Sequence, residues 1–417
     1  MTARATSHWR DIAVSALALV ALAGCRTDNL GAYTQAIENR APQEAAPDIG
    51  EEFRLSNLQP NQRPAPNTDE ESLWFIIDRA ESKMKTAGNR VDDTRLTTYV
   101  KSVTCRVAGP HCKDIRSYVL RIPAFNATMY PNGMTTVWTG LLLRVRNEAQ
   151  LAAVIGHETG HFLRRHSLQR MRDIIEQTNA LVFIQFALAG AGAGSMNGVL
   201  SVLVNGGFAA FSRDNEREAD GYGIVLAAEA GYDPREAAKI WQQLERERKA
   251  NEDQIGPVPF FASHPPTVER AHMLALLGDK FASPKARDIG RERFLAAILP
   301  IRADLLRDEM HLRKYDSFSV LLDMLMEDGA NLAELHYFKG EMHRLRQKEG
   351  DAKIALNSYN AAKTVEGSAP ADIERSIALV HRQLGQNAEA RAALQRYLDT
   401  NPKANDAAMI RQMLGDQ

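Results

Sequence analysis

Residues 157–161 read His-Glu-Thr-Gly-His, and this stretch sets the interpretation of the whole chain. On a helix, the i, i+4 spacing places His157 and His161 on the same face about one turn apart, so both imidazoles can reach one metal ion. Glu158 lies beside them, within reach of a water molecule at an open position of that metal. The pattern predicts a metal site, and the alternative is a pair of core histidines bonded to neighbouring groups.

The residues around this motif predict a buried helix. Apolar side chains recur at helical spacing at Leu151, Val154, Ile155 and Phe162. Asn147 and Gln150 can form a capping box at the start of the helix. A buried helix should carry two histidines and a glutamate only where their polar atoms are satisfied, which favours the metal site.

A third ligand has to come from another part of the chain. Arg164 and Ser167 occupy the positions where metzincins carry a glycine and a histidine, so that class is excluded. His166 lies nine residues after His157, and at about 100° per residue a continuous helix points it to the opposite side. We therefore expect His166 at the surface or in a second layer around the site.

Glu216 is the preferred third ligand, because Glu216 and Asp220 lie one turn apart in a second periodic segment. Asp220 can accept a hydrogen bond from the far ring nitrogen of a ligand histidine, which fixes the tautomer of that ring. The alternative for this acidic cluster is a solvated helix face with ion pairs to Arg213 and Arg217, and Glu218 fits that alternative.

The motif followed by Ser-Arg-x-x-Glu-x-x-Ala-Asp, here Ser212 to Asp220, resembles the gluzincin metallopeptidases that include HtpX, the CAAX prenyl endopeptidase and BepA. Asn126-Ala127 and the stretch from Asn132-Gly133 to Gly140-Leu141-Leu142 resemble the hairpin before the active helix of that family. Ser263-His264-Pro265 resembles its His-Pro segment. The resemblance implies a zincin-type metallopeptidase domain, within a fold that is mainly α with a small β-sheet, and one zinc ion per chain.

The resemblance also implies a role for each matching residue. His157, His161 and Glu216 would be the zinc ligands, Glu158 the general base, and Asp220 the support of a ligand histidine. Zinc would lower the pKa of its water, and Glu158 would take the proton and later return it to the leaving amine. The expected reaction is hydrolysis of peptide bonds.

His264 and Arg213 are candidates for contacts with the oxyanion of this reaction. His264 precedes Pro265 and Pro266, which favour a stiff, extended backbone. Its imidazole could therefore be held across the cleft as a fourth ligand that shuts the enzyme. A structural role in the loop is the alternative.

The N-terminus resembles a bacterial lipoprotein signal peptide. Arg4 and Arg10 precede an apolar run, residues 12–23, that is too short for a stable transmembrane helix. The residues that follow resemble a lipobox, which makes Cys25 the lipidated first residue of the mature protein. Arg26 stands where an inner-membrane retention signal would have aspartate, so the resemblance implies a lipid anchor in the outer membrane. A transmembrane anchor is the alternative, and the proline-rich polar stretch up to residue 70 predicts a flexible tether.

Cys105 and Cys112 flank the sequence Arg-Val-Ala-Gly-Pro-His. In an oxidising periplasm this spacing predicts a disulfide across a turn. A minor metal site that includes His111 is the alternative.

A strand and a hairpin are predicted before the metal motif. Tyr118, Leu120 and Ile122 alternate with other residues as in a β-strand. Asn132-Gly133 predicts a tight turn between residues 124–130 and 134–138. An exposed edge beside the metal would let an extended substrate add as a further strand.

Residues 180–211 are apolar and rich in glycine. Polar residues interrupt the segment and the glycines lower its helix propensity, which disfavours continuous crossing of a roughly 30 Å bilayer core. We expect buried or cleft-covering helices here, with membrane insertion as the alternative.

The last third of the chain contains an internal repeat. Gly350, Ala355 and Tyr359 recur 35 residues later as Gly385, Ala390 and Leu394. Small residues where helices cross, with a large residue on the packing face, resemble the tetratricopeptide repeat, whose stacked units bind proteins on a concave surface. An ordinary helical bundle is the alternative.

These observations predict five segments: a signal peptide (1–24), a lipidated tether (25–70), a zinc metallopeptidase domain (71–280), a helical linker (281–304) and tetratricopeptide-like repeats (305–417). The formal net charge of −1 offers no footprint for nucleic acid. The interpretation is a periplasmic zinc endopeptidase that degrades unfolded or misassembled envelope proteins and can contact the outer-membrane assembly machinery. The alternative is a chaperone or assembly scaffold with a latent metal site.

Overall fold

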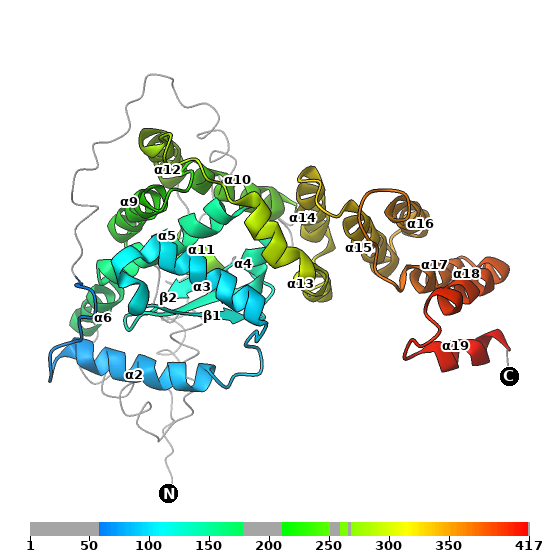
Figure 1. Cartoon of the computed structure of the whole chain (residues 1–417), viewed down its shortest axis with the longest axis horizontal. Helices are drawn as coiled ribbons and strands as arrows, with labels where there is room; N and C mark the ends of the chain where they lie inside the picture. Colours follow the sequence, from blue (N-terminus) through cyan, green and yellow to red (C-terminus); the bar gives the residue numbers. More distant parts are fainter. Residues whose placement is uncertain (1–57, 178–210, 251–258, 266–267, 416–417) are drawn as a thin grey trace, which may run out of the picture.

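The computed structural model describes residues 58–177, 211–250, 259–265 and 268–415. The predicted signal peptide, Cys25, most of the predicted tether and nearly all of the apolar segment 180–211 lie outside the described residues. Figure 1 shows the helices and strands, which are α2 (Asp69–Met84), α3 (Thr94–Ala108), η2 (Gly109–Lys113), β1 (Arg116–Leu120), β2 (Ala127–Met129), β3 (Met134–Trp138), α4 (Thr139–Arg144), α5 (Glu148–Leu163), α6 (His166–Gln177), α9 (Arg213–Glu229), α10 (Glu236–Lys249), α11 (Pro259–Ser263), α12 (Val268–Phe281), α13 (Arg291–His311), α14 (Tyr315–Glu327), α15 (Leu332–Arg346), α16 (Asp351–Ala362), α17 (Ile373–Gln383), α18 (Asn387–Thr400) and α19 (Ala407–Leu414).

The described part of the chain is mostly helical with one small sheet, as the sequence predicted. The strands lie in the order β1-β3-β2, with β1 parallel and β2 antiparallel to β3. The hairpin predicted at Asn132-Gly133 is confirmed, and Gly133 adopts φ 81°. A Cβ atom at Gly133 would lie 2.1 Å from the carbonyl oxygen of Asp114, so both its backbone angle and its surroundings require glycine.

Helix α5 belongs to the N-terminal part of the described chain, and all of its residues are buried. The Asn147 side chain caps it by accepting a hydrogen bond of 2.9 Å from the backbone N–H of Gln150. The Gln150 side chain accepts from the backbone N–H of Arg146, one residue earlier than a capping box requires. These bonds satisfy N–H groups at the buried start of the helix.

Small residues let α5 and α9 approach closely. Cβ atoms at Gly156 and Gly223 would each lie 2.9 Å from the backbone of the opposite helix. One turn along, a Cβ atom at Gly160 would lie 2.7 Å from the Cβ of Tyr222. This close contact brings the side chains of α9 to those of α5, although the two helices are far apart in the sequence.

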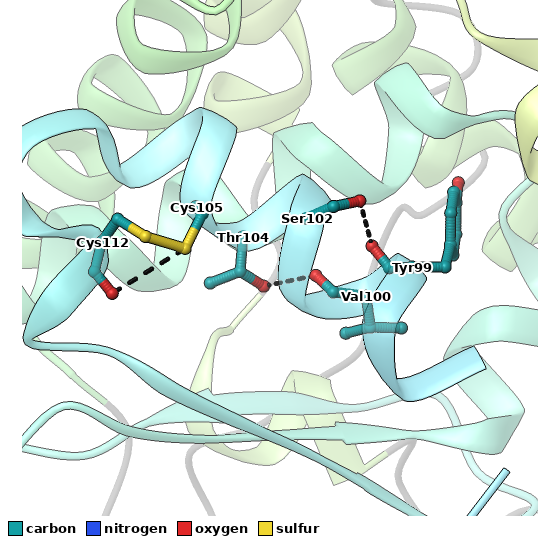
Figure 2. The surroundings of a disulfide bond; sticks show 6 residues. All are labelled: Tyr99, Val100, Ser102, Thr104, Cys105 and Cys112. Carbon is teal, nitrogen blue, oxygen red and sulfur yellow. Dashed lines mark hydrogen bonds between the residues drawn. A yellow bond between two sulfur atoms is a disulfide. The ribbon is translucent and has the colours of Figure 1, made fainter. Parts of the chain in front are cut away.

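Cys105 and Cys112 form a disulfide that ties the end of α3 to η2, with Cα atoms 4.5 Å apart (Figure 2). His111 lies beside it, and its Nδ1 is 3.3 Å from a carboxylate oxygen of Asp114. Both sulfur atoms are therefore used by the disulfide, which leaves no thiolate for the alternative metal site.

Helices α13–α19 extend from the N-terminal part as a row of helices (Figure 1) and share a second hydrophobic core. Gly350 has φ 80° and precedes α16, the second helix of the α15/α16 pair. Gly385 has φ 71° and precedes α18, the second helix of the α17/α18 pair. A Cβ atom at Gly340 would lie 2.4 Å from the ring of Tyr359, where α15 and α16 cross. The 35-residue period thus joins structurally equivalent positions, while the tetratricopeptide assignment stays a prediction.

Two of the predicted segment limits fall inside packed structure. Residue 305, where the repeats were expected to begin, lies within the continuous helix α13. Leu58, inside the predicted tether, is buried against Ile115 and Met129 of the N-terminal part. The limit at 70 was predicted from composition and the limit at 305 from the repeat period, and neither signal reports packing between segments.

Arg144 joins the N-terminal part to the C-terminal helices. Its guanidinium donates to Glu247 of α10 at 2.9 Å and to both carboxylate oxygens of Glu309 of α13 at 2.7 and 3.0 Å. All three side chains are buried, and burial raises the pKa of Glu247 to about 7. Within the described residues, no helix combines the length and apolarity needed to cross a membrane.

Candidate metal centre

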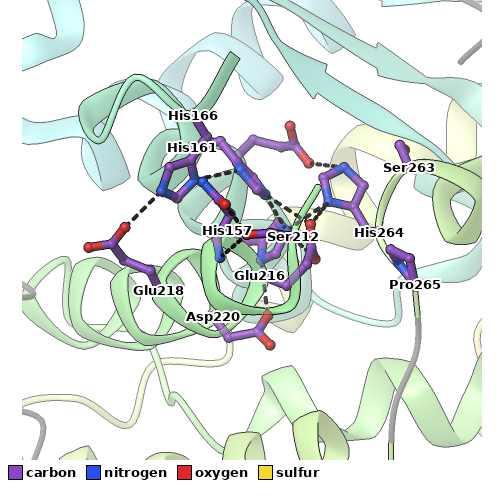
Figure 3. A network of polar contacts seen from close by, with 12 residues as sticks. His157, His161, His166, Ser212, Glu216, Glu218, Asp220, Ser263, His264 and Pro265 are labelled. Carbon is purple, nitrogen blue, oxygen red and sulfur yellow. Dashed lines mark hydrogen bonds and ion pairs between the residues drawn. The ribbon is translucent and has the colours of Figure 1, made fainter. Parts of the chain in front are cut away.

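Four buried side chains converge on one point: His157, His161, Glu216 and His264 (Figure 3). One potential ligand atom from each lies within 4.8 Å of the others. The Nε2 atoms of His157 and His161 are 3.1 Å apart, and Nε2 of His157 is 3.2 Å from Nδ1 of His264. Oε1 of Glu216 is 2.9 Å from Nδ1 of His264 and 3.5 Å from Nε2 of His161.

Three elements supply this group. His157 and His161 lie one turn apart on α5, as their spacing predicted. Glu216 lies in the first turn of α9, whose start is fixed by Ser212, because its hydroxyl accepts a hydrogen bond from the backbone N–H of Asn215. His264 directly follows the short helix α11 and stacks on Phe260 at 4.6 Å.

The donor set fits a divalent metal such as zinc. Imidazole nitrogens and a carboxylate oxygen are the ligands that zinc prefers in proteins. Burial lowers the pKa of His161 well below its usual value, which keeps the ring neutral as a ligand must be. Although burial acts in the opposite direction, His264 and Arg270 hold the pKa of Glu216 well below its usual range. Glu216 is therefore anionic at neutral pH, as a carboxylate ligand would have to be.

Glu158 lies next to this group with one oxygen fixed and one available. Its Oε2 accepts a hydrogen bond of 3.1 Å from the backbone N–H of Met129 in β2. Its Oε1 is buried, has no hydrogen-bond partner among the described residues, and lies 3.5 Å from Nε2 of His264. Burial raises the pKa of Glu158, which suits a group that must accept a proton near neutral pH.

Asp220 supports His157 from the side away from the cluster. Its Oδ1 lies 3.0 Å from Nδ1 of His157, so Nε2 faces the other ligands. Arg270 of α12 binds Asp220 and also places Nη1 2.7 Å from Oε2 of Glu216. Sequence reasoning missed Arg270, because no spacing rule connects an arginine of α12 to carboxylates of α9.

The structure does not bring Arg213 into the cluster. Arg213 is the first residue of α9 and its side chain is exposed, whereas Glu216 and Asp220 on the same helix are buried. Its proposed contact with the oxyanion therefore has no support in this arrangement. His264 is the one of the two candidates that lies at the centre.

His166 lies in a second layer around the site, which was one of the two positions predicted for it. It is completely buried, with Nδ1 2.8 Å from Nδ1 of His161, although a continuous helix would have pointed it to the opposite side. Glu218, in contrast, occupies a position that the sequence did not predict. Glu218 does not lie on a solvated face with Arg213 and Arg217; its Oε2 is 2.7 Å from Nε2 of His166. The helical projection failed because α5 ends at Leu163 and the chain turns before His166.

Comparisons with known proteins agree with this geometry. Residues 91–276 match the profile described as Peptidase family M48. The chain is 37% identical over 180 residues to mitochondrial metalloendopeptidase OMA1 of Schizosaccharomyces pombe, which covers 42% of this chain and 50% of that protein. It is 26% identical over 195 residues to the beta-barrel assembly-enhancing protease of Escherichia coli K12, which covers 44% of this chain and 37% of that protein. The matched region thus spans half or less of the length of these relatives.

Proposed function

Because residues 91–276 form a peptidase family M48 domain, we propose that this chain is a zinc-dependent endopeptidase of the bacterial cell envelope that cleaves unfolded or misassembled proteins. The observation that carries the proposal is the convergence of His157, His161 and Glu216 beside the available oxygen of Glu158. A purely structural cluster would gain nothing from a buried carboxylate oxygen left without a partner.

In the proposed reaction, His157, His161 and Glu216 would hold the zinc ion. Zinc, when bound, supplies a Lewis acid for the scissile carbonyl and lowers the pKa of water. Glu158 accepts the proton of the attacking water on Oε1 while the Met129 N–H holds Oε2 in place. Glu158 then returns this proton to the nitrogen of the leaving amine.

Substrate would bind in an extended form along β2, which is an edge strand of the described sheet. The N–H of Tyr130 and the carbonyl of Asn126 bond to β3, so the backbone groups of Ala127 point to the opposite side. A peptide added there would use backbone hydrogen bonds, which demand little of its sequence. Broad specificity for unfolded chains would follow.

His264 is proposed to close the site at rest. It lies 2.9 Å from Glu216 and 3.5 Å from Glu158, so it is in direct contact with a proposed zinc ligand and with the general base. Burial acts to lower the pKa of His264, but the carboxylates of Glu216 and Glu158 raise it. Replacement by alanine should increase proteolysis if His264 has to leave before substrate enters.

The location and partners are proposed from the sequence and from the relatives. A lipid on Cys25 would anchor the protein to the outer membrane, with the rest of the chain in the periplasm. The C-terminal helices would bind substrates or assembly machinery, and they contain a cavity lined by residues that include Arg313, Tyr315, Tyr337 and Arg344. That cavity is the observation that favours the second candidate function, a scaffold or chaperone with a latent metal site.

Casein degradation by the purified chain, its bound zinc and the Glu158→Gln variant test the proposal together. We expect Glu158→Gln to keep zinc and lose cleavage, and Glu269→Gln, an exposed carboxylate outside the cluster, to behave as wild type. If the wild-type protein binds zinc, but neither it nor the His264→Ala variant cleaves casein or unfolded envelope proteins, the scaffold remains as the function.

A further inference from the structure

Each of the two proposed zinc ligands on α5 begins a hydrogen-bonded chain of side chains that ends at a carboxylate. The two hydrogen-bonded chains differ in the number of side chains that they contain. His157 is bonded directly to a carboxylate, Asp220, at 3.0 Å. His161 reaches a carboxylate only through a second imidazole: its Nδ1 lies 2.8 Å from Nδ1 of His166, and Nε2 of His166 lies 2.7 Å from Glu218 (Figure 3). The second hydrogen-bonded chain lies outside the four side chains that converge on the candidate metal position, so its role requires its own explanation.

The chain of atoms has only one hydrogen-bonding direction that is compatible with metal binding. Glu218 lies between two donors, with Oε1 2.8 Å from Nε of Arg164 and Oε2 2.7 Å from Nε2 of His166, so its carboxylate accepts from both. Nε2 of His166 must then carry the proton, which leaves Nδ1 of a neutral His166 as an acceptor. Nδ1 of His161 must therefore donate, and Nε2 of His161 keeps its lone pair toward the other ligands.

The local backbone is built to place His166 there. Arg165 adopts φ 56°, a left-handed conformation that ends α5, and α6 begins at the next residue. Arg165 pairs with Glu70 at 3.2 Å, and Nε of Arg164 lies 2.8 Å from Oε1 of Glu218. This conformation is strained for a non-glycine residue, and here it turns His166 back over His161.

We propose that His166 and Glu218 are positioning residues that fix the Nδ1–H tautomer and the ring orientation of His161, and thereby set the zinc affinity of the site. This inference rests on the proposed function, because it assumes that His161 is a zinc ligand. His166 does not bind the metal itself, since its two ring nitrogens are used by His161 and Glu218. Outer partners of this kind typically change metal affinity by about 10–100-fold when they are removed.

The test measures zinc affinity by competition with a chelator, and the absorption of the cobalt(II)-substituted protein, without any assay of cleavage. His166→Phe keeps a ring but removes the acceptor, and we expect zinc to bind about 10–100-fold more weakly with an altered cobalt spectrum. His166→Gln offers an oxygen to His161 and an N–H to Glu218, so it should recover much of the affinity. His311→Phe, at an exposed histidine of α13, is the control and should bind zinc as wild type does.

Glu218→Ala tests the same hydrogen bonds if His166→Phe does not fold, because the Glu218 side chain is 28% exposed, whereas His166 is completely buried. It should weaken zinc binding several-fold while the circular dichroism and thermal midpoint of the metal-free protein stay near wild type. Wild-type zinc affinity and an unchanged cobalt spectrum in Glu218→Ala, or in a folded His166→Phe, would overturn the inference. A wild-type protein that binds no zinc would instead contradict the proposed function, so the two failures are distinguishable.

Discussion

Arg270 donates hydrogen bonds to both carboxylate oxygens of Asp220, at 2.7 and 2.9 Å, directly behind the ring of His157. Both side chains are almost completely buried, and Arg270 also lies 2.7 Å from Glu216. One cation therefore compensates two buried anions, of which one supports a proposed ligand and the other is a proposed ligand. The stability of the centre and its chemistry depend on the same arginine.

Replacing Arg270 by methionine should destabilise the protein strongly. The change keeps an apolar stem but leaves Asp220 and Glu216 buried without their cation, which costs about 3–5 kcal/mol. Urea unfolding of the metal-free protein measures the loss. Arg217→Met breaks exposed pairs with Asp214 and Glu269 and should change stability by no more than about 0.5 kcal/mol. Equal stabilities of the two variants would mean that the buried pair is solvated in solution.

Glu247 should make the stability of the protein depend on pH. Burial raises its pKa from 4.5 to about 7, so the folded state holds the proton more strongly than the unfolded state. The resulting stabilisation is fully present below pH 4.5 and is lost as the pH rises through about 7, and it amounts to at most roughly 3 kcal/mol.

Urea unfolding at intervals between pH 5 and 8 measures this dependence. Glu247→Gln should flatten the profile, because the amide stays neutral and Arg144 keeps its pair with Glu309. Glu327→Gln, at an exposed carboxylate paired with Arg246, is the control and should not flatten it. Parallel profiles for wild type and Glu247→Gln would show that Glu247 remains ionised across this range.

Loss of the disulfide should have a modest effect on stability. The bond closes a short loop, with Cys105 and Cys112 only 7 residues apart, so it stabilises by about 2 kcal/mol in the chain-entropy model. A Cys105→Ser/Cys112→Ser protein should lose that amount in chemical unfolding, and dithiothreitol should no longer affect it. Cys25→Ser should leave the effect of dithiothreitol intact, and two free thiols in unreduced Cys25→Ser protein would exclude the bond.

Gly340→Ala should destabilise the C-terminal helices. The new methyl group would meet the ring of Tyr359 at 2.4 Å, and the ring is buried where α15 and α16 cross. Such overpacking costs about 1–3 kcal/mol. Gly88→Ala meets nothing within 4 Å and is the control. Limited proteolysis of α15–α18 in the two variants gives the measurement, and identical cleavage patterns would show that the crossing can relax.

Several parts of the centre could be predicted from the sequence because they depend on local geometry. The spacing of His157 and His161 fixes their shared face once a helix forms, and Asn132-Gly133 fixes a tight turn wherever two strands flank it. The same rules predicted that Glu216 and Asp220 lie on one face. These relationships extend over four residues or fewer, so no knowledge of packing was required.

The arrangement around those residues could not be predicted in this way. His166 was projected onto a continuous helix, but α5 ends at a left-handed Arg165, and neither glycine nor asparagine marks that end in the sequence. Glu218 was interpreted from its charged neighbours, although its partner lies 52 residues away in the chain. Arg270 carries no motif that connects it with Asp220.

By itself, the sequence determined the type of site: which residues can bind a metal, which residue can accept a proton, and which helix carries them. Only the tertiary structure decided that α5 and α9 approach at glycine contacts, that Arg270 compensates two anions, and that His166 faces His161. The physical reason is that helical periodicity and turn chemistry act between near neighbours, whereas the orientation of a ligand ring and the pairing of a buried charge depend on side chains that packing brings together from distant segments.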